Sequence, residues 1–301
     1  MSVHNQDKPV GAVTKTILVF YPQMEKVIEF YENSSSLYSG EKIIPWDEYR
    51  QTDLSGERVV ILGRHSNFHH LDISHIKILR QKGVIPEPEY TTVVVFDWHE
   101  DLDNEPGRTE LTSGSWAYLG LEQNLYSNLY IVGTGPKGID EMNPWQCEGE
   151  IRPPTGEILK KMNRVFLFPA ASSFSRLKFF PEYEQFIANN ESVAEYFLVK
   201  EGGFVEIRFK SMKQVGYENR KEVVVVSIDL DVLKRSVIRT VCPQGIMESG
   251  ELIAHLRKVK RSGPINAILV CGLTEEKESQ DDESLYTIAE ILSEASTLLS
   301  A

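Results

Sequence analysis

The sequence predicts an α/β fold in which a central, mainly parallel sheet lies between two layers of helices. Short apolar runs rich in β-branched residues recur along the chain, and segments of helical periodicity separate them. Such runs are typical of strands buried on both faces of a parallel sheet, and strands that alternate with helices imply βαβ units. Several of the runs also end in polar residues, as expected where a parallel sheet carries its ligand site.

The elements follow from these patterns in order. We expect strands at the apolar runs of residues 16–21, 58–62, 91–96, 129–132, 164–168, 222–228 and 267–270. We expect helices where apolar residues recur at helical spacing, at residues 24–31, 181–188, 250–260 and 285–299. Residues 172–176 and 202–216 are less regular, and we interpret them as insertions. No fixed-period repeat or linker divides the chain, so we expect a single domain over residues 1–301.

The composition limits the class of partner. The net charge is −12, which argues against nucleic acid and against a membrane surface, because both need a basic footprint. The three cysteines form no CxxC pair and predict neither a disulfide framework nor a zinc ribbon. Residues 1–10 are polar, and no apolar run is long enough to span a bilayer. We therefore expect a cytoplasmic protein with a small-molecule substrate, and the sequence leaves a homo-oligomer open.

The strongest polar cluster directly follows the run at 91–96, where Asp97, His99 and Asp101 occupy alternate positions. Alternate side chains of an extended segment share one face, so the three converge if the chain stays extended. If the chain bends after His99, Asp97 still lies between two ion positions and the other two serve one each. The alternative is a solvated acidic loop that contains a histidine. We favour a metal site, and we also expect Asp101 and His99 to act in catalysis.

A second cluster, Asp229 and Asp231, follows the run at 222–228. Two carboxylates on one face repel each other and raise each other's pKa unless a cation lies between them, and a metal ion is the usual answer. The alternative is a helix N-cap followed by an exposed aspartate.

A third strand end, at 58–62, leads through Gly63 into His65. A glycine lets the backbone turn there, and we interpret His65 as a further ligand rather than as a structural histidine.

In this order the three strand ends resemble those of the arginase, agmatinase and formiminoglutamase (ureohydrolase) family. The matching segments are Gly-x-His-Ser at 63–66, Asp-x-His-x-Asp at 97–101 and Ser-x-Asp-x-Asp at 227–231. Residues 112–114 resemble the Thr-Ser-Gly substrate loop of the family, and residues 243–246 resemble its Pro-Gly-Gly-Leu turn. The resemblance spans residues 58–275 and implies an arginase/deacetylase-like αβα fold.

The resemblance also implies a site with two divalent ions, usually Mn²⁺, with Zn²⁺ as the alternative. The implied metal ligands are His65, Asp97, His99, Asp101, Asp229 and Asp231. Asp97 and Asp229 would bridge the ions, while His65 and Asp101 complete one set and the remaining two residues complete the other. A hydroxide held between the ions would attack the carbon of a guanidino, amidino or formimino group in a small molecule, and the tetrahedral intermediate would expel an amine.

The substrate-facing parts depart from the family pattern. Arg64 stands where the family has an aspartate, and Ala117 stands where arginases have a proton-shuttling histidine. Cys271 or Gly272 stands where a glutamate pairs with the guanidinium. The bulky Trp116 suggests a reshaped pocket. We therefore expect the metal ligands to be kept and true arginase or agmatinase activity to be absent.

Two other functions remain open. One is a single-zinc, deacetylase-like amidohydrolase, because His69 and His70 resemble the paired histidines of that related group. Its zinc would be held by Asp97, His99 and Asp229, but a one-metal site does not need the second carboxylate of each aspartate motif. The other is a metal-binding, arginase-like protein without ureohydrolase activity.

The paired histidines have a simpler interpretation. His69, His70 and His75 fall within the helix expected after residue 65, and we interpret them as part of its solvated face.

Overall fold

The computed structural model describes most of the chain outside its middle third. The described residues are 16–34, 36–38, 40–52, 57–63, 66–99, 101, 111–133, 146–147, 150–151, 165–168, 193–200, 203–210, 222–240, 245–273 and 281–300.

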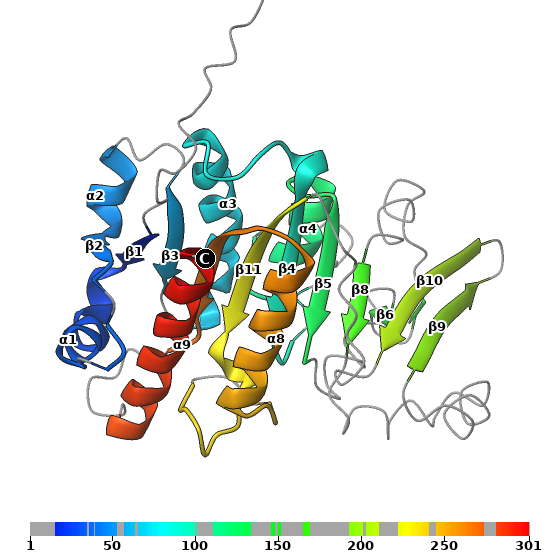
Figure 1. Cartoon of the computed structure of the whole chain (residues 1–301). Coiled ribbons are helices and arrows are strands. Elements are labelled where there is room, and N and C mark those ends of the chain that lie inside the picture. Colours follow the sequence, from blue (N-terminus) through cyan, green and yellow to red (C-terminus); the bar gives the residue numbers. More distant parts are fainter. Residues whose placement is uncertain are drawn as a thin grey trace, which may run out of the picture.

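The centre of the structure is a ten-stranded sheet (Figure 1). Its order is β2 (Lys42–Pro45), β1 (Thr16–Phe20), β3 (Arg58–Leu62), β12 (Ile265–Cys271), β11 (Val223–Asp229), β4 (Thr91–Phe96), β5 (Asn128–Val132), β8 (Val165–Phe168), β10 (Gly203–Lys210) and β9 (Val193–Lys200). Neighbouring strands pair in parallel except β9 and β10, which are antiparallel. Separately, β6 (Gln146–Cys147) and β7 (Glu150–Ile151) form a two-stranded sheet.

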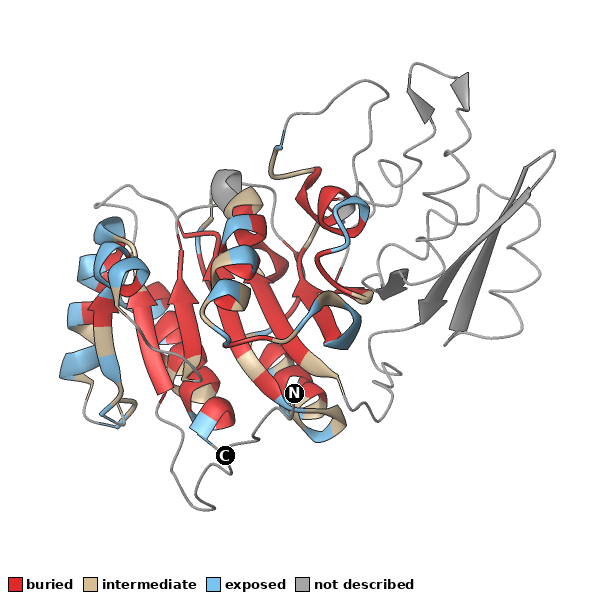
Figure 2. Cartoon of the chain, turned by 90° about the horizontal axis from the view of Figure 1, so that it is seen from above, coloured by how far each residue is buried: buried red, intermediate tan, exposed pale blue. Residues whose placement is uncertain are grey.

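Helices cover both faces of this sheet (Figure 2). One apolar cluster joins the sheet to α2 (Trp46–Gln51), α3 (Asp72–Gln81) and α4 (Trp116–Glu122). A second cluster joins the opposite face to α1 (Glu25–Asn33), α8 (Ser249–Ser262) and α9 (Asp282–Ser300). Short 3-10 helices occur at Pro22–Met24, Ser66–Leu71, Pro88–Tyr90 and Leu230–Val232. The predicted three-layer αβα fold with a mainly parallel sheet is therefore confirmed.

The apolar runs gave most strands within a residue or two, because strands buried on both faces leave an uninterrupted signal in the sequence. One expectation was wrong: residues 202–216 contain the strand Gly203–Lys210. Its sequence alternates apolar and charged residues from 205 to 210, a period typical of a strand. The helix expected at 181–188 and the insertion expected at 172–176 lie outside the described residues.

The four strands β3, β12, β11 and β4 are consecutive neighbours at the middle of the sheet. The registers pair Leu62 with Val270, Asp229 with Cys271 and Ile228 with Phe96, so these strands end side by side. Residues that follow them are therefore brought to one edge, where ligands bind in open parallel sheets.

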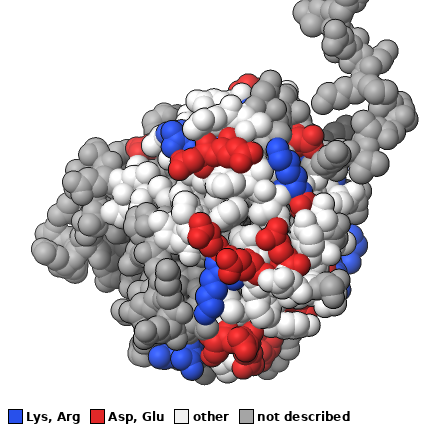
Figure 3. All heavy atoms as spheres, turned by 90° about the vertical axis from the view of Figure 1, so that its left-hand side faces the viewer, with Lys and Arg blue, Asp and Glu red and all other residues white. Residues whose placement is uncertain are grey.

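The described surface is rich in acidic groups on the side that carries α1 and α2. Figure 3 shows Asp and Glu covering more of this face than Lys and Arg. Exposed acidic residues of these two helices are Glu25, Glu29, Glu32, Asp47 and Glu48. Among the described helices, none combines the length and apolar character needed to cross a membrane.

Candidate metal centre

Two groups of side chains converge beyond the ends of β4 and β11. The first, called here the outer group, consists of Asp97, His99 and Asp231. The Nδ1 atom of His99 lies 3.0 Å from Oδ2 of Asp231 and 3.5 Å from Oδ1 of Asp97. Backbone N–H groups fix both carboxylates, since His99 donates to Asp97 at 2.6 Å and Trp98 donates to Asp231 at 3.2 Å. The His99 side chain is 26% exposed, so the outer group opens toward solvent.

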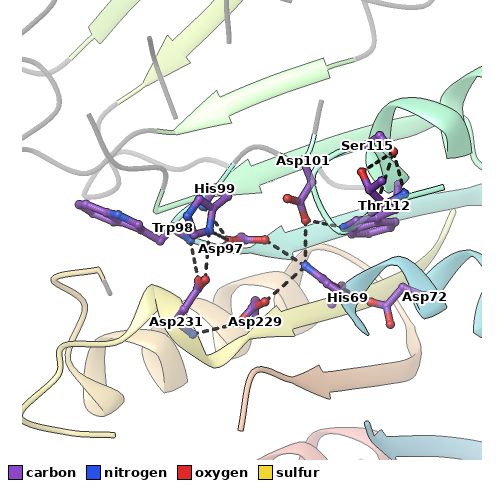
Figure 4. A network of polar contacts seen from close by, with 12 residues as sticks. His69, Asp72, Asp97, Trp98, His99, Asp101, Thr112, Ser115, Asp229 and Asp231 are labelled. Carbon is purple, nitrogen blue, oxygen red and sulfur yellow. Dashed lines mark hydrogen bonds and ion pairs between the residues drawn. The ribbon is translucent and has the colours of Figure 1, made fainter. Parts of the chain in front are cut away.

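The second, called the inner group, surrounds His69 and consists of His69, Asp97, Asp101 and Asp229 (Figure 4). The Nδ1 atom of His69 lies 2.9 Å from Oδ2 of Asp101, 3.1 Å from Oδ2 of Asp97 and 3.6 Å from Oδ2 of Asp229. All four side chains are buried. The inner group is thus an imidazole enclosed by three carboxylates.

Asp97 belongs to both groups, and its two oxygens face different ones. Oδ1 faces His99, whereas Oδ2 faces His69. The backbone of Asp101 has a φ of +53°, in the left-handed region that non-glycine residues seldom adopt. The chain therefore bends after His99, so that His99 joins the outer group and Asp101 joins the inner group. Of the two arrangements that the sequence left open, the structure has the bent one.

A buried chain of hydrogen bonds holds His69 from behind. Its Nε2 lies 2.8 Å from Oγ of Ser227, and Ser227 donates to Oδ2 of Asp72 at 2.5 Å. The other oxygen of Asp72 lies 3.1 Å from Nδ1 of His75, whose Nε2 lies 2.9 Å from the Tyr21 hydroxyl. Because these contacts occupy Nε2, they leave the Nδ1 of His69 directed at the carboxylates. Such partners orient a metal-ligating histidine.

Trp116 performs a similar role for Asp101. Its indole Nε1 donates to Oδ2 of Asp101 at 2.5 Å, and its ring centroid lies 4.7 Å from that of His69. Trp116 is fully buried in the apolar cluster under the sheet. The expectation that Trp116 reshapes a substrate pocket was therefore wrong: its N–H satisfies a carboxylate, and its ring is part of the core.

Two glycines allow the backbone to pass close to the aspartates. Gly272 has a φ of +104°, and a Cβ there would lie 2.3 Å from Oδ1 of Asp229. Gly245 donates its N–H to the carbonyl of Asp231 at 2.6 Å, and a Cβ there would lie 2.1 Å from the carbonyl oxygen of Val232. Glycine at both positions keeps the second aspartate pair in place.

The electrostatics of the centre call for positive charge. Burial, followed by the charges of Asp231 and Asp97, raises the pKa of Asp229 well above its ordinary value. Burial and the charge of Asp97 raise the pKa of Asp231 to about 6, although His99 partly offsets them. Burial opposes protonation of His99, but its contacts with Asp231 and Asp97 raise its pKa overall. Uncompensated buried carboxylates each cost several kcal/mol, so this arrangement favours bound cations.

Two buried atoms of the centre indicate that a metal ion fits there. Among the described side chains, the His69 Nδ1 and the Asp231 Oδ2 lack a hydrogen-bond partner although each lies about 3 Å from another group of the site. Two ligands of the same ion lie close together in this way, without a hydrogen bond between them. The donors are carboxylate oxygens and imidazole nitrogens, which suit Mn²⁺ and also Zn²⁺. The residues therefore fit one divalent ion in each group.

The structure brings together five of the six predicted ligands, namely Asp97, His99, Asp101, Asp229 and Asp231. The sixth, His65, lies outside the described residues. In the described centre the imidazole of the inner group comes from His69. The solvated face expected for His69 and His75 was wrong, since both are buried. His69 and His75 each lie three residues from Asp72, the first residue of α3, and this helical spacing of polar side chains was readable in the sequence.

Solved structures of ureohydrolases share this fold. Formimidoylglutamase from Bacillus subtilis subsp. subtilis str. 168 matches with a TM-score of 0.56 and 15% sequence identity, covering 96% of this chain and 88% of that chain. Arginase from Medicago truncatula matches with a TM-score of 0.56 and 13% identity, covering 95% and 87%. A triple mutant of an arginase-like protein from T. brucei, bound with Mn²⁺, matches with a TM-score of 0.57 and 13% identity, covering 97% and 93%.

No protein-family model and no curated protein sequence matches the chain. The likeness to the solved structures therefore concerns the fold, and at this level it confirms the resemblance read from the three strand ends.

Proposed function

We propose that the protein is a binuclear metal-dependent hydrolase that cleaves a non-peptide C–N bond in a small molecule of the guanidino, amidino or formimino type. The observation that carries this proposal is the pair of Asp97 oxygens, one facing each ligand group. A carboxylate so placed suits two neighbouring ions better than one. The fold shared with formimidoylglutamase and arginase supports the choice of C–N substrates.

In this proposal each group has a distinct task. Two divalent ions, when bound, supply Lewis acidity and lower the pKa of a coordinated water toward neutrality. His69, Asp101 and Asp229 would hold the inner ion. Asp231 and His99 would hold the outer ion, and Asp97 would contribute to both. Because His99 is the partly exposed member, the substrate approaches from its side. Asp101 is buried and bonded to Trp116, so it acts through the ion rather than on the substrate.

Arginine and agmatine are not the proposed substrates. Ala117, at the position of the proton-shuttling histidine, is buried and its N–H donates to the carbonyl of Asp101. Gly272, one of the two residues at the guanidinium-binding position, has no side chain and is packed against Asp229. Loss of a general acid or base alone typically costs a factor of about 10²–10⁴ in rate. We expect urea release from both compounds near background.

The two alternatives remain distinguishable. His69 is buried among carboxylates rather than on a solvated helix face, which gives the deacetylase-like alternative more support than the sequence alone did. Against a single zinc site, Asp101 and Asp231 both turn into the centre, where one ion leaves at least one of them uncompensated. A metal-binding protein without hydrolase activity would keep every feature of the centre and turn over nothing.

The test is a turnover screen of the full chain loaded with Mn²⁺ or Zn²⁺, with release of ammonia, urea or free amine as the readout. Guanidino, amidino, formimino and acyl-amine compounds are compared, and Asp97→Asn protein is the control. Release from a formimino or amidino compound that disappears in the control supports the proposal. Release from acyl-amines alone supports the deacetylase, and inactivity on all four classes of compound supports the non-enzymatic alternative.

A further inference from the structure

A thiol lies beside the inner group. Cys271 is the last residue of β12 and pairs in register with Asp229, the last residue of β11. It is a free cysteine and is only 5% exposed. Ligand atoms of Cys271, His69 and Asp229 all lie within 4.8 Å of one another. The sulfur is thus within reach of an ion that the inner group would hold.

A second observation points to a ligand at the same place. The His69 side chain is 1% exposed, and its Nδ1 lacks a hydrogen-bond partner although it faces the centre. His69 therefore offers an unused donor that shares its surroundings with the thiol. Immediately after Cys271, Gly272 brings the backbone against Asp229, where a side chain would displace the carboxylate. The turn thus keeps Cys271, Asp229 and His69 together.

We propose that Cys271 is a ligand of the inner ion, so that the inner position prefers a thiophilic divalent ion such as Zn²⁺ or Co²⁺ over Mn²⁺. This inference rests on the proposed function, because it assumes an ion in the inner group. Thiolate ligands select softer ions than carboxylates do. The outer group consists only of carboxylates and an imidazole, so the two positions differ in the ion they favour.

Coordination of the ion by Cys271 needs neither an oxidant nor a reductant. On binding, the thiol releases its proton to solvent, and a sulfur lone pair forms the bond to the ion. Without an ion, burial and the neighbouring charge of Asp229 raise the pKa of the Cys271 thiol, and the group stays neutral. A bound cation reverses this balance, because a coordinating thiol is deprotonated.

The test uses Co²⁺, whose bond to a thiolate gives a charge-transfer absorption that nitrogen and oxygen ligands do not give. The full chain carrying Cys147→Ser and Cys242→Ser retains Cys271 as its single thiol. We expect this protein to develop the band as Co²⁺ is added. Adding Cys271→Ser should abolish the band while Co²⁺ still binds, since a hydroxyl and the other ligands remain.

Several outcomes would overturn the inference. If Co²⁺ binds the single-thiol protein without the band, the thiol is not a ligand although the metal centre stands. If no Co²⁺, Zn²⁺ or Mn²⁺ binds at all, the proposed function fails with it.

X-ray absorption of the unaltered protein with Zn²⁺ supplies a measurement that needs no variant. It should show a sulfur neighbour at about 2.3 Å, and a shell of nitrogen and oxygen alone would contradict the inference.

Discussion

The outer and inner groups use the same kinds of side chain in different surroundings. The outer group opens toward solvent through His99, whereas every member of the inner group is buried. The outer carboxylates are fixed by backbone N–H groups, whereas the inner histidine is held by a chain of side chains that ends at Tyr21. We therefore propose that the outer position meets the substrate and that the inner position anchors the centre.

The largest effect should come from the residue that both groups share. Asp97→Asn removes the charge that faces both positions, and we expect both ions to be lost, with affinity falling more than the roughly 10–100-fold typical of supporting residues. Asp231→Asn should instead release mainly the outer ion, and Asp101→Asn mainly the inner one. Metal analysis after dialysis measures this. Retention of one ion by Asp97→Asn protein would show that the carboxylate does not bridge.

Asp72→Asn should have a smaller effect on metal affinity, and this effect should be confined to the inner ion. The charged Asp72 is stabilised in the fold, since its contacts with His69 and His75 lower its pKa despite burial. The amide weakens the chain that orients His69, so we expect inner-ion affinity to fall about 10–100-fold. The outer ion of the same protein is the internal control, and calorimetric titration resolves the two. Equal weakening of both would mean that the variant disturbs the whole centre.

The effect of pH separates the metal-free centre from the filled one. Asp231, with a pKa raised to about 6, holds protons in the fold that the unfolded chain has already lost. Without metal, its contribution to stability is therefore lost as pH rises through about 6. The pKa values of His69 and His99 are also raised. Without metal, their contributions to stability are therefore likewise lost as pH rises above neutrality. Ligands must lose these protons to bind an ion, so stabilisation by metal should grow with pH.

The corresponding measurement is the gain in Tm on adding Mn²⁺ at about pH 5.5 and about pH 7.5. A ligand at a hundred times its Kd stabilises the fold by about 2.7 kcal/mol, and we expect most of this gain only at the higher pH. A gain that is independent of pH would contradict ligation by these carboxylates.

The smallest effect should come from Trp116→Phe, which keeps the aromatic packing and removes the N–H donor to Asp101. We expect the inner ion to weaken by about 10-fold, at the low end for a supporting residue. Tyr49→Phe is the matched control, because Tyr49 is fully buried in the same apolar cluster and its ring stacks on Trp46 rather than on a residue of the centre. Equal losses in the two variants would assign the effect to packing alone.

The two groups also differ in how far the sequence predicted them. The outer group consists of residues that directly follow buried strands, and strand ends could be read from the apolar runs. The inner histidine depends on how the chain turns between Leu62 and α3, and residues 64 and 65 lie outside the described part. Periodicity does not fix such a turn. Cys271 was recognised as a departure from the family pattern, but its approach to Asp229 and His69 follows from strand register, which only the structure shows.

The proposed function requires the chain to hold two divalent ions, one in each group. The most direct measurement is the metal content of the unaltered protein after loading and removal of free ions, by elemental analysis against protein concentration. We expect close to two ions per chain, falling to about one in His99→Ala protein, which loses the outer imidazole. A content of no more than one ion in the unaltered protein would contradict the proposed function.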